Sequence, residues 1–299
     1  KLTILLEAII LKQLKPRKAL NKAYLKLKPY GKKIDIFKTN LIELLDTINE
    51  SESEEYQKNL ISDFLKNTYY KDDHFINTKD RADLVIHNGK NRSSSVGVII
   101  ETKRPSNRWE MITPKEINAK AFHELLLYYL RERITNNNKD IHNLIVTNIH
   151  EWYIFDSTVF EHNFTQNKAL IRQFEAFEKS KQRTEVFYSE IAHPFIESLK
   201  NEIEFAYFDI RDYNQPLRND NADDGVDLVL TALRHPNTRD DGGQHQTGHH
   251  RDHKQAGLSS GSAGSHLQEG RHEAECREHR DAEGKTNSRG YDEQVVAEQ

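Results

Sequence analysis

One stretch, residues 83–105, restricts the fold more than any other part of the chain. Asp83 to His87 is a short β-branched run, and residues 88–95 have the composition of a polar turn headed by Asn-Gly. Residues 96–103 form a second, more apolar run. Arg104-Pro105 ends it, because proline cannot donate a hydrogen bond to a strand ladder. The stretch therefore predicts a β-hairpin.

Three charged side chains fall at the open end of this hairpin. Side chains alternate along a strand, so Glu101 and Lys103 share a face, and an antiparallel return places Asp83 beside them. Glu101 follows directly on Val98-Ile99-Ile100, and charges that close to a buried run need a compensating partner. A solvated strand end with a surface ion pair is the alternative interpretation.

Two carboxylates and an ammonium group in one place suit the hydrolysis of a phosphodiester. Converging carboxylates repel each other, and Mg²⁺ relieves the repulsion because it takes oxygen ligands, usually with one or two protein carboxylates. We expect Asp83 and Glu101 to hold the metal, with the Thr102 carbonyl as a further oxygen. Lys103 would then orient the attacking water, which the metal activates.

The order of elements around the hairpin indicates the α/β class. Ser51 or Ser53 caps an expected helix with acids in its first turn, and apolar periodicity predicts a second helix and several short strands. The expected elements are a helix at 51–70, a strand at 75–78, the hairpin, a helix at 116–133, and strands at 143–149 and 151–156. This order predicts a central mixed sheet flanked by helices.

Three further residues are second-tier site candidates. Glu55 lies in the first turn of the 51–70 helix, where it either faces the site or simply suits the helix dipole. Glu124 and Tyr128 stand one turn apart on the 116–133 helix, as ExxxY, and either face the site or lie on the helix surface.

The segments on either side of this core are expected to be helical. Residues 1–50 form a basic helical segment in which Lys12 to Lys38 interleaves lysines and arginines with Tyr24 and Tyr30. This segment is interpreted either as a contact to the DNA backbone or as a solvated helix face. Residues 161–223 predict a helical connector, with apolar residues at helical spacing from Leu170 to Ile203.

Composition changes abruptly near Asp224. The last 75 residues hold ten of the thirteen glycines and eight of the fifteen histidines, but only two lysines. We interpret residues 224–299 as a disordered tail, because its apolar content is too low to offset chain entropy, and as frame-shifted or non-native sequence. Histidines at 245, 249, 250 and 253 have a spacing that could bind zinc, but no folded scaffold is expected to hold them.

Overall composition excludes several classes of protein. One cysteine, Cys276, excludes a disulfide framework and a cysteine-based zinc site. No apolar run approaches the roughly 18 residues of a membrane span, so no membrane association is expected and the cytoplasm is the default compartment. The first residue is Lys1 and the one methionine is Met111, so we expect a fragment or partial reading frame.

The motif Asp83, Glu101-x-Lys103 resembles that of the PD-(D/E)xK nuclease superfamily, with Ala82 in place of the proline. Longer stretches resemble the amino-terminal part of type IIG (Eco57I-like) restriction-modification enzymes. These stretches are FKTNLIELLDTINESESEEYQKNLISDFLKNTYY, HFINTKDRADLVIHNG, GVIIETKRP, NAKAFHELLLYYLRERI, NLIVTNIHEWYIFD and EFAYFDIRDY. The likeness runs from about Ile36 to Asp223. Some branches of the superfamily carry QxxxY where Glu124 and Tyr128 stand here.

The resemblance implies a restriction-endonuclease-like core at 51–160 that hydrolyses phosphodiester bonds in double-stranded DNA. Such enzymes add an S-adenosylmethionine-dependent adenine methyltransferase and a target recognition domain. Neither the Asn-Pro-Pro-Tyr/Phe tetrapeptide nor a glycine-rich cofactor loop occurs in this sequence, so we expect a truncated enzyme. A double-strand break needs two cleavage events, which implies a transient dimer on DNA. The alternative function is a catalytically inactive remnant that binds DNA or another partner.

Overall fold

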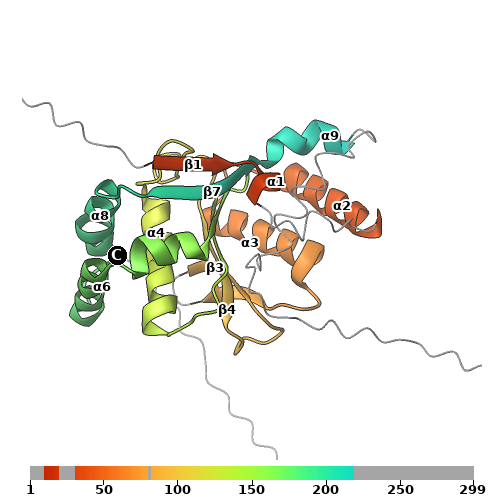
Figure 1. Cartoon of the computed structure of the whole chain (residues 1–299). Coiled ribbons are helices and arrows are strands. Elements are labelled where there is room, and N and C mark those ends of the chain that lie inside the picture. Colours follow the sequence, from red (N-terminus) through yellow and green to blue (C-terminus); the bar gives the residue numbers. More distant parts are fainter. Residues whose placement is uncertain (1–9, 20–30, 80–81, 219–299) are drawn as a thin grey trace, which may run out of the picture. The chain divides into compact units, whose positions relative to one another are not determined.

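Seven strands form one mixed sheet in the part of the chain that the structure, a computed structural model, describes: residues 10–19, 31–79 and 82–218. The strands are β1 (Ile10–Leu14), β2 (Ile76–Lys79), β3 (Ala82–His87), β4 (Val96–Thr102), β5 (Asn143–Thr147), β6 (Glu151–Asp156) and β7 (Glu202–Asp209). Their order across the sheet is β1-β7-β6-β5-β4-β3-β2 (Figure 1). The pairs β1/β7 and β4/β5 are parallel and the others are antiparallel.

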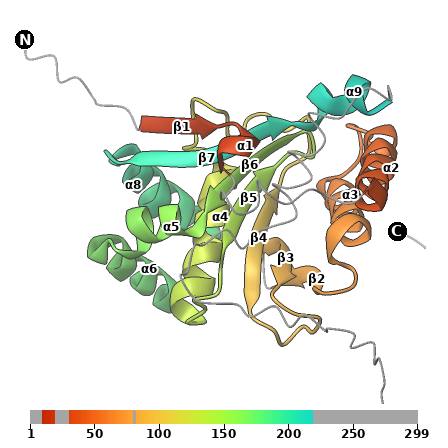
Figure 2. The ribbon, with the colours of Figure 1, turned by 45° about the vertical axis from the view of Figure 1, so that its right-hand side comes forward.

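Helices cover both faces of this sheet. They are α1 (Pro16–Ala19), α2 (Gly31–Thr47), α3 (Glu54–Leu65), α4 (Lys120–Leu130), α5 (Ser157–Phe160), α6 (Lys168–Ser180), α7 (Thr184–Val186), α8 (His193–Glu197) and α9 (Asn214–Arg218). Helices α4, α5, α6 and α8 lie on one face, and α2, α3 and α9 lie on the other (Figure 2). The expected α/β class, with a mixed sheet flanked by helices, is therefore confirmed. No described helix is long and apolar enough to cross a membrane.

Strand β4 is buried on both faces, which explains its continuous apolar sequence. Ile99 contacts the apolar layer under α4, where Phe122 packs against Phe155 and Phe160 with ring centroids 5.3 Å apart. Ile100 contacts the opposite layer, under α2 and α3. The charged residues that follow Ile100 therefore lie at the end of an inner strand of the sheet, between two helical layers.

The hairpin and the elements around it match the sequence prediction. Ser53 caps α3 by accepting a hydrogen bond from the backbone N–H of Tyr56. Strands β3 and β4 pair antiparallel, with Leu84 opposite Ile100, and β5 and β6 follow α4 as expected. Helix α4 begins later than predicted, at Lys120, because residues 113–118 close a turn between Thr113 and Glu116.

The prediction that residues 161–223 form a purely helical connector is wrong, because β7 lies within it and joins the sheet. Phe195, Leu199 and Ile203 stand at the spacing of a helix, which is why the sequence predicts one here. From Glu202 onward, however, buried and exposed residues largely alternate, as the period of a strand requires. Strand β7 pairs with β6 and β1, so this segment belongs to the same sheet as the predicted core.

The prediction that residues 1–50 are helical is also wrong at Ile10–Leu14, which forms the edge strand β1. Strand β1 owes its conformation to parallel pairing with β7, a contact between distant parts of the chain. Lys12 supports the pairing through ion pairs with Glu202 and Glu204. Tyr24, Tyr30, the tail 224–299 and its four histidines lie outside the described residues.

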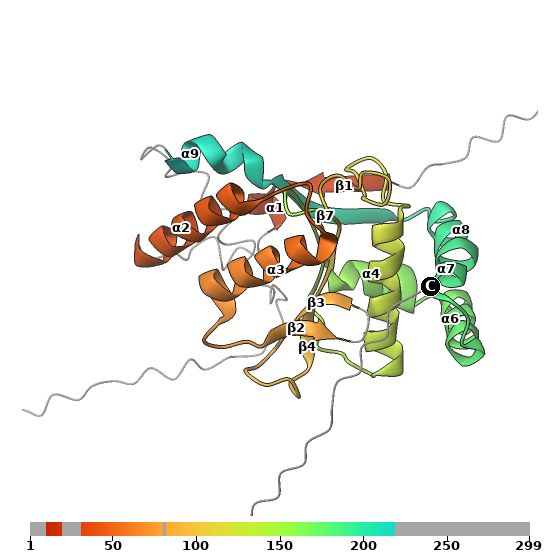
Figure 3. The same ribbon diagram turned by 180° about the vertical axis from the view of Figure 1, so that it is seen from behind.

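The parallel pairing of β4 and β5 requires a crossover connection, and α4 supplies it. The chain leaves β4, runs through residues 103–119 and returns along α4 before entering β5 (Figure 3). The first turns of α4 therefore lie near the carboxyl ends of β4 and β5. In α/β sheets, this edge is where ligands and catalytic groups usually gather.

His123 on α4 makes the stability of the fold depend on pH. It is buried between Tyr188 and His193, and its Nε2 lies 2.7 Å from Asn118 Oδ1. Burial, with the nearby His193, lowers the pKa of His123 to about 4. Below the pKa of the unfolded chain, near 6.5, only the unfolded state readily takes the proton. The stability due to neutral His123 is therefore full above that value and is lost as the pH falls toward 4.

We expect His123→Gln to remove this part of the pH dependence. The gap of about 2.5 pKa values corresponds to at most about 3 kcal/mol of unfolding free energy. Urea unfolding of both proteins at about pH 7.5 and about pH 4.5 measures it. An equal loss of stability in both proteins would contradict the assignment.

Candidate active site

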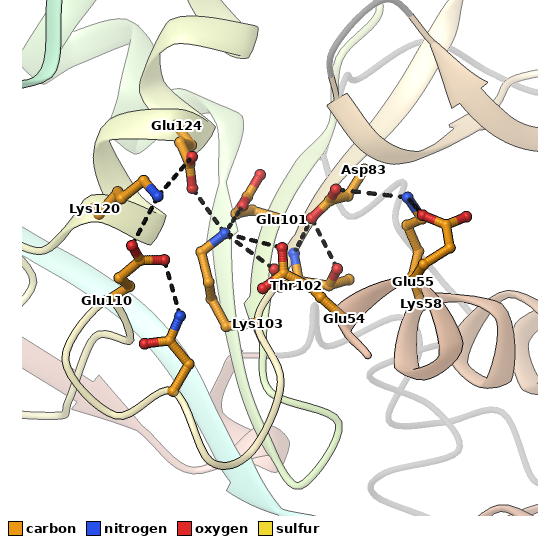
Figure 4. Close-up of polar contacts among 11 residues, drawn as sticks. Glu54, Glu55, Lys58, Asp83, Glu101, Thr102, Lys103, Glu110, Lys120 and Glu124 are labelled. Carbon is orange, nitrogen blue, oxygen red and sulfur yellow. Dashed lines mark hydrogen bonds and ion pairs between the residues drawn. The ribbon is translucent and has the colours of Figure 1, made fainter. Parts of the chain in front are cut away.

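The predicted triad comes together where β3 begins and β4 ends, between the first turns of α3 and α4 (Figure 4). Glu101 and Lys103 are 1% and 3% exposed, and Asp83 is half-buried beside them. The backbone N–H of Lys103 donates to the carbonyl of Thr147, at 2.9 Å, so β5 fixes the end of β4. The three residues therefore stand on the rigid middle of the sheet.

Lys103 is the centre of the cluster. Its Nζ donates to Glu101 Oε1, lies 2.8 Å from Glu124 Oε2 and donates to the Thr102 carbonyl at 3.2 Å. Burial alone would lower the pKa of Lys103, but the carboxylates of Glu101 and Glu124 outweigh it and the pKa is raised. Lys103 therefore stays an ammonium ion although its side chain is buried, which is rare for a lysine.

Glu101 is buried with more negative than positive charge around it. Burial, together with the nearby Asp83 and Glu124, raises its pKa well above the usual value although Lys103 opposes the shift. Its Oε1 accepts from Lys103, whereas its Oε2 is buried without a hydrogen-bond partner. An unpartnered buried carboxylate oxygen is costly, so this atom is suited to accept a cation or a proton.

Asp83 is oriented by the strand beside it. Its Oδ2 accepts hydrogen bonds from the backbone N–H of Thr102, at 2.9 Å, and from Thr102 Oγ1, at 2.8 Å. Its Oδ1 has a weaker contact, 3.9 Å from Lys58 Nζ on α3. Asp83 thus keeps one oxygen turned away from the strand. Thr102 holds Asp83 through its amide and hydroxyl, and it holds Lys103 through its carbonyl.

Helix α3 brings two acids to the site in different ways. Glu54 Oε1 lies 3.8 Å from Lys103 Nζ, and burial raises the pKa of Glu54. Glu55 is more exposed and pairs with Lys58, so it reaches the cluster through that lysine. Sequence reasoning singled out Glu55 and missed Glu54 and Lys58. The position of Glu54 directly after the N-cap Ser53 was the available signal.

Of the two candidates on α4, Glu124 is in direct contact with the cluster and Tyr128 is not. Glu124 Oε2 forms an ion pair with Lys103 Nζ, and Glu124 Oε1 lies 3.9 Å from Lys120 Nζ. Tyr128 is half-buried, and burial next to Glu101 and Tyr188 raises its pKa. No hydrogen bond joins its hydroxyl to Asp83, Glu101 or Lys103 among the described residues.

The charges of the cluster do not balance. The cluster in Figure 4 has three more carboxylates than lysines if all are ionised: Glu54, Glu55, Asp83, Glu101, Glu110 and Glu124 against Lys58, Lys103 and Lys120. Among the described residues, no group of three or more His, Cys, Asp or Glu side chains is arranged to hold a metal ion. Any metal bound here would therefore take one or two protein carboxylates and complete its shell with water or substrate oxygens, as Mg²⁺ commonly does.

Fold and site together define an α/β protein with a buried lysine held among carboxylates at the carboxyl edge of its central strands. Comparison with family models places residues 14–233 in a domain of unknown function, DUF7149, and the chain belongs to that family. No match was found among curated proteins or among solved structures.

Proposed function

We propose that this chain is a Mg²⁺-dependent nuclease domain that hydrolyses phosphodiester bonds in double-stranded DNA, on a core of the PD-(D/E)xK type. One observation carries the proposal: Asp83, Glu101 and Lys103 meet at the end of the central hairpin, with Lys103 buried as an ammonium ion between carboxylates. Buried ionisable groups with strongly shifted pKa values are more common at functional sites than elsewhere.

The residues present fit a hard divalent cation. Glu101 Oε2 is a buried carboxylate oxygen without a hydrogen-bond partner, and Asp83 Oδ1 has only the 3.9 Å contact with Lys58. Asp83 and Glu101 would hold the ion, with the Thr102 carbonyl close by. When bound, Mg²⁺ polarises a phosphoryl oxygen and lowers the pKa of a water.

The residues of the chain position and neutralise the reacting groups. Lys103 offers an ammonium ion that orients the attacking water and offsets the negative charge that grows on the phosphate. In the reaction one water oxygen–phosphorus bond forms and one phosphorus–ester oxygen bond breaks, with a proton passing to the leaving oxygen. Asp83 stays in place because Thr102 donates two hydrogen bonds to it.

The resemblance to type IIG restriction-modification enzymes supports a wider proposal. The nuclease would be one part of a cytoplasmic restriction system that acts on DNA through a transient dimer. S-adenosylmethionine would belong to a methyltransferase part that this sequence does not contain. Glu54, Glu55, Glu124 and Tyr128 would tune the charge of the site without taking part in bond breaking.

Asp83→Asn tests the function. The substitution keeps an oxygen that accepts from Thr102, so the fold is expected to persist, but it removes the charge that would hold Mg²⁺. We expect the full chain to nick supercoiled plasmid in Mg²⁺ or Mn²⁺, and EDTA to stop it. We expect Asp83→Asn to lower the rate by about 10²-fold or more.

Asp63→Asn is the matched control, because Asp63 is an exposed aspartate on the same helix as Glu54 and Lys58. It should cut at the wild-type rate. Cleavage by Asp83→Asn at the wild-type rate would contradict the proposal. DNA binding without metal-dependent cleavage by the wild-type chain would instead favour an inactive DNA-binding remnant.

A further inference from the structure

The loop that joins β4 to α4, residues 104–119, starts directly after Lys103 and ends one turn before Glu124. Pro105, Met111, Ile112 and Ile117 are buried and anchor it to the core. Both ends of the loop thus belong to the candidate active site. Whatever the outer part of the loop contacts will lie close to the proposed reacting groups.

Trp109, at the outer part of this loop, is 95% exposed. The other tryptophan of the chain, Trp152, is fully buried and stacks on Phe208, with ring centroids 6.1 Å apart and an interplanar angle of 6°. Tryptophan side chains are highly buried on average. An exposed indole on an ordered loop therefore indicates a surface that binds a flat, apolar group.

Two exposed arginines precede Trp109 in the loop. Arg104 and Arg108 are both exposed, and neither forms an ion pair with any described residue. Among the other described arginines, Arg131, Arg133, Arg211 and Arg218 each pair with a carboxylate, whereas Arg17, Arg92, Arg172 and Arg183 do not. The loop therefore presents uncompensated positive charge next to an acidic cluster.

The shape of the loop is fixed by its own hydrogen bonds. Glu110 accepts from Asn107 Nδ2 at 2.9 Å and from Lys120 Nζ at 2.8 Å, and its carbonyl accepts from the backbone N–H of Ala121. The acid of the loop is thus turned inward and neutralised. Arg104, Arg108 and Trp109 are exposed to solvent on a loop whose backbone is held by these hydrogen bonds.

We propose that this loop binds DNA beside the phosphodiester that is cut, with Arg104 and Arg108 on phosphates and Trp109 stacked on a nucleobase. The inference rests on the proposed function, because that function places DNA next to the loop. Guanidinium groups recognise phosphate oxygens, and aromatic side chains stack on bases without regard to sequence. The loop would add affinity and hold the strand without choosing the target sequence.

Intrinsic fluorescence tests the stacking directly, because Trp152 is buried and Trp109 is exposed. The full chain is titrated in EDTA, which prevents cleavage, with a DNA duplex of about 30 base pairs, its single strand, and heparin as a polyanion without bases. We expect both DNAs to quench the emission of Trp109 and heparin to leave it unchanged. Trp109→Phe, which retains Trp152, should show no quenching.

Affinity provides the second measurement. Stacking predicts that Trp109→Ala weakens binding of the fluorescently labelled duplex about 10-fold or more, with an unchanged melting temperature. Arg104→Ala with Arg108→Ala should reduce the slope of log affinity against log salt by about 2. Arg172→Ala, an exposed arginine on α6, serves as the charge-matched control and should change neither quantity.

DNA binding that leaves Trp109 emission unchanged, with Trp109→Ala binding within about 2-fold of wild type, would overturn the inference. Equal quenching by heparin would also overturn the stacking, because heparin has no bases. The proposed function is tested separately by metal-dependent cleavage and its loss in Asp83→Asn. Quenching without cleavage would leave the loop a DNA contact and refute the nuclease.

Discussion

Replacement of Lys103 by alanine is expected to lower the rate of Mg²⁺-dependent plasmid cleavage by at least about 10²- to 10³-fold. Lys103 is the buried cation of the site, and Glu101 and Glu124 raise its pKa, so it carries full charge at the pH of any practical assay. The charge that develops on the phosphate would lose its nearest fixed positive partner.

The fold should survive this substitution at a lower melting temperature. Removing one partner of a buried ion pair usually leaves an uncompensated charge and is strongly destabilising. Glu101 escapes most of this cost, because burial already raises its pKa and it can take a proton once Lys103 is gone. Circular dichroism should therefore show native secondary structure, and cleavage should be measured well below the transition.

Lys120→Ala is the matched control. Lys120 also lies beside Glu124, but at 3.9 Å instead of 2.8 Å, and its side chain is 41% exposed instead of 3%. The same substitution at Lys120 should leave the cleavage rate within a few-fold of wild type. Cleavage by Lys103→Ala at the wild-type rate, or an equal loss in Lys120→Ala, would refute the role of Lys103.

The triad could be predicted from sequence because local geometry alone brings its members together. Asp83 and Lys103 are twenty residues apart, but a hairpin with a polar turn returns the chain within that span, and alternation puts Glu101 and Lys103 on one face. Glu124 could be proposed for a similar reason, since the crossover helix must return over the strand that it follows.

The parts that were missed depend on contacts between distant segments. Segment β7 forms a strand because β6 and β1 pair with it. The apolar spacing from Phe195 to Ile203 does not predict those pairings. The choice between Glu54 and Glu55 depends on the rotation of α3 against the sheet. That rotation is set by the packing of residues such as Ile61 and Phe64.

Glu101→Gln is expected to abolish cleavage and, at neutral pH, to stabilise the fold. Glu101 is fully buried among Asp83, Glu124 and Lys103, and burial together with the two neighbouring acids raises its pKa. A glutamine amide can donate to Glu124 and accept from Lys103 without adding a negative charge. We expect a gain of about 1–3 kcal/mol in unfolding free energy.

The gain should depend on pH with a definite sign. The folded-state pKa of Glu101 is raised above its unfolded value of 4.5, so the folded protein holds this proton more tightly than the unfolded chain. The stability of the wild-type protein therefore falls as the pH rises from about 4.5 through the folded-state pKa, whereas the glutamine amide of the variant does not titrate. The advantage of the variant should be largest at about pH 8 and should shrink toward about pH 5.

Glu132→Gln is the control, because Glu132 is also a buried glutamate but its charge is compensated. Its carboxylate accepts from Lys79 at 2.5 Å, from Asn136 at 3.0 Å and from Asn138 at 3.3 Å. Loss of that charge should destabilise the protein in urea unfolding at the same pH values. If Glu101→Gln were destabilised as much as Glu132→Gln, the charge of Glu101 would be structural. A stabilised but inactive Glu101→Gln would mean that the fold keeps this buried carboxylate at a cost in stability, as expected of a residue retained for chemistry.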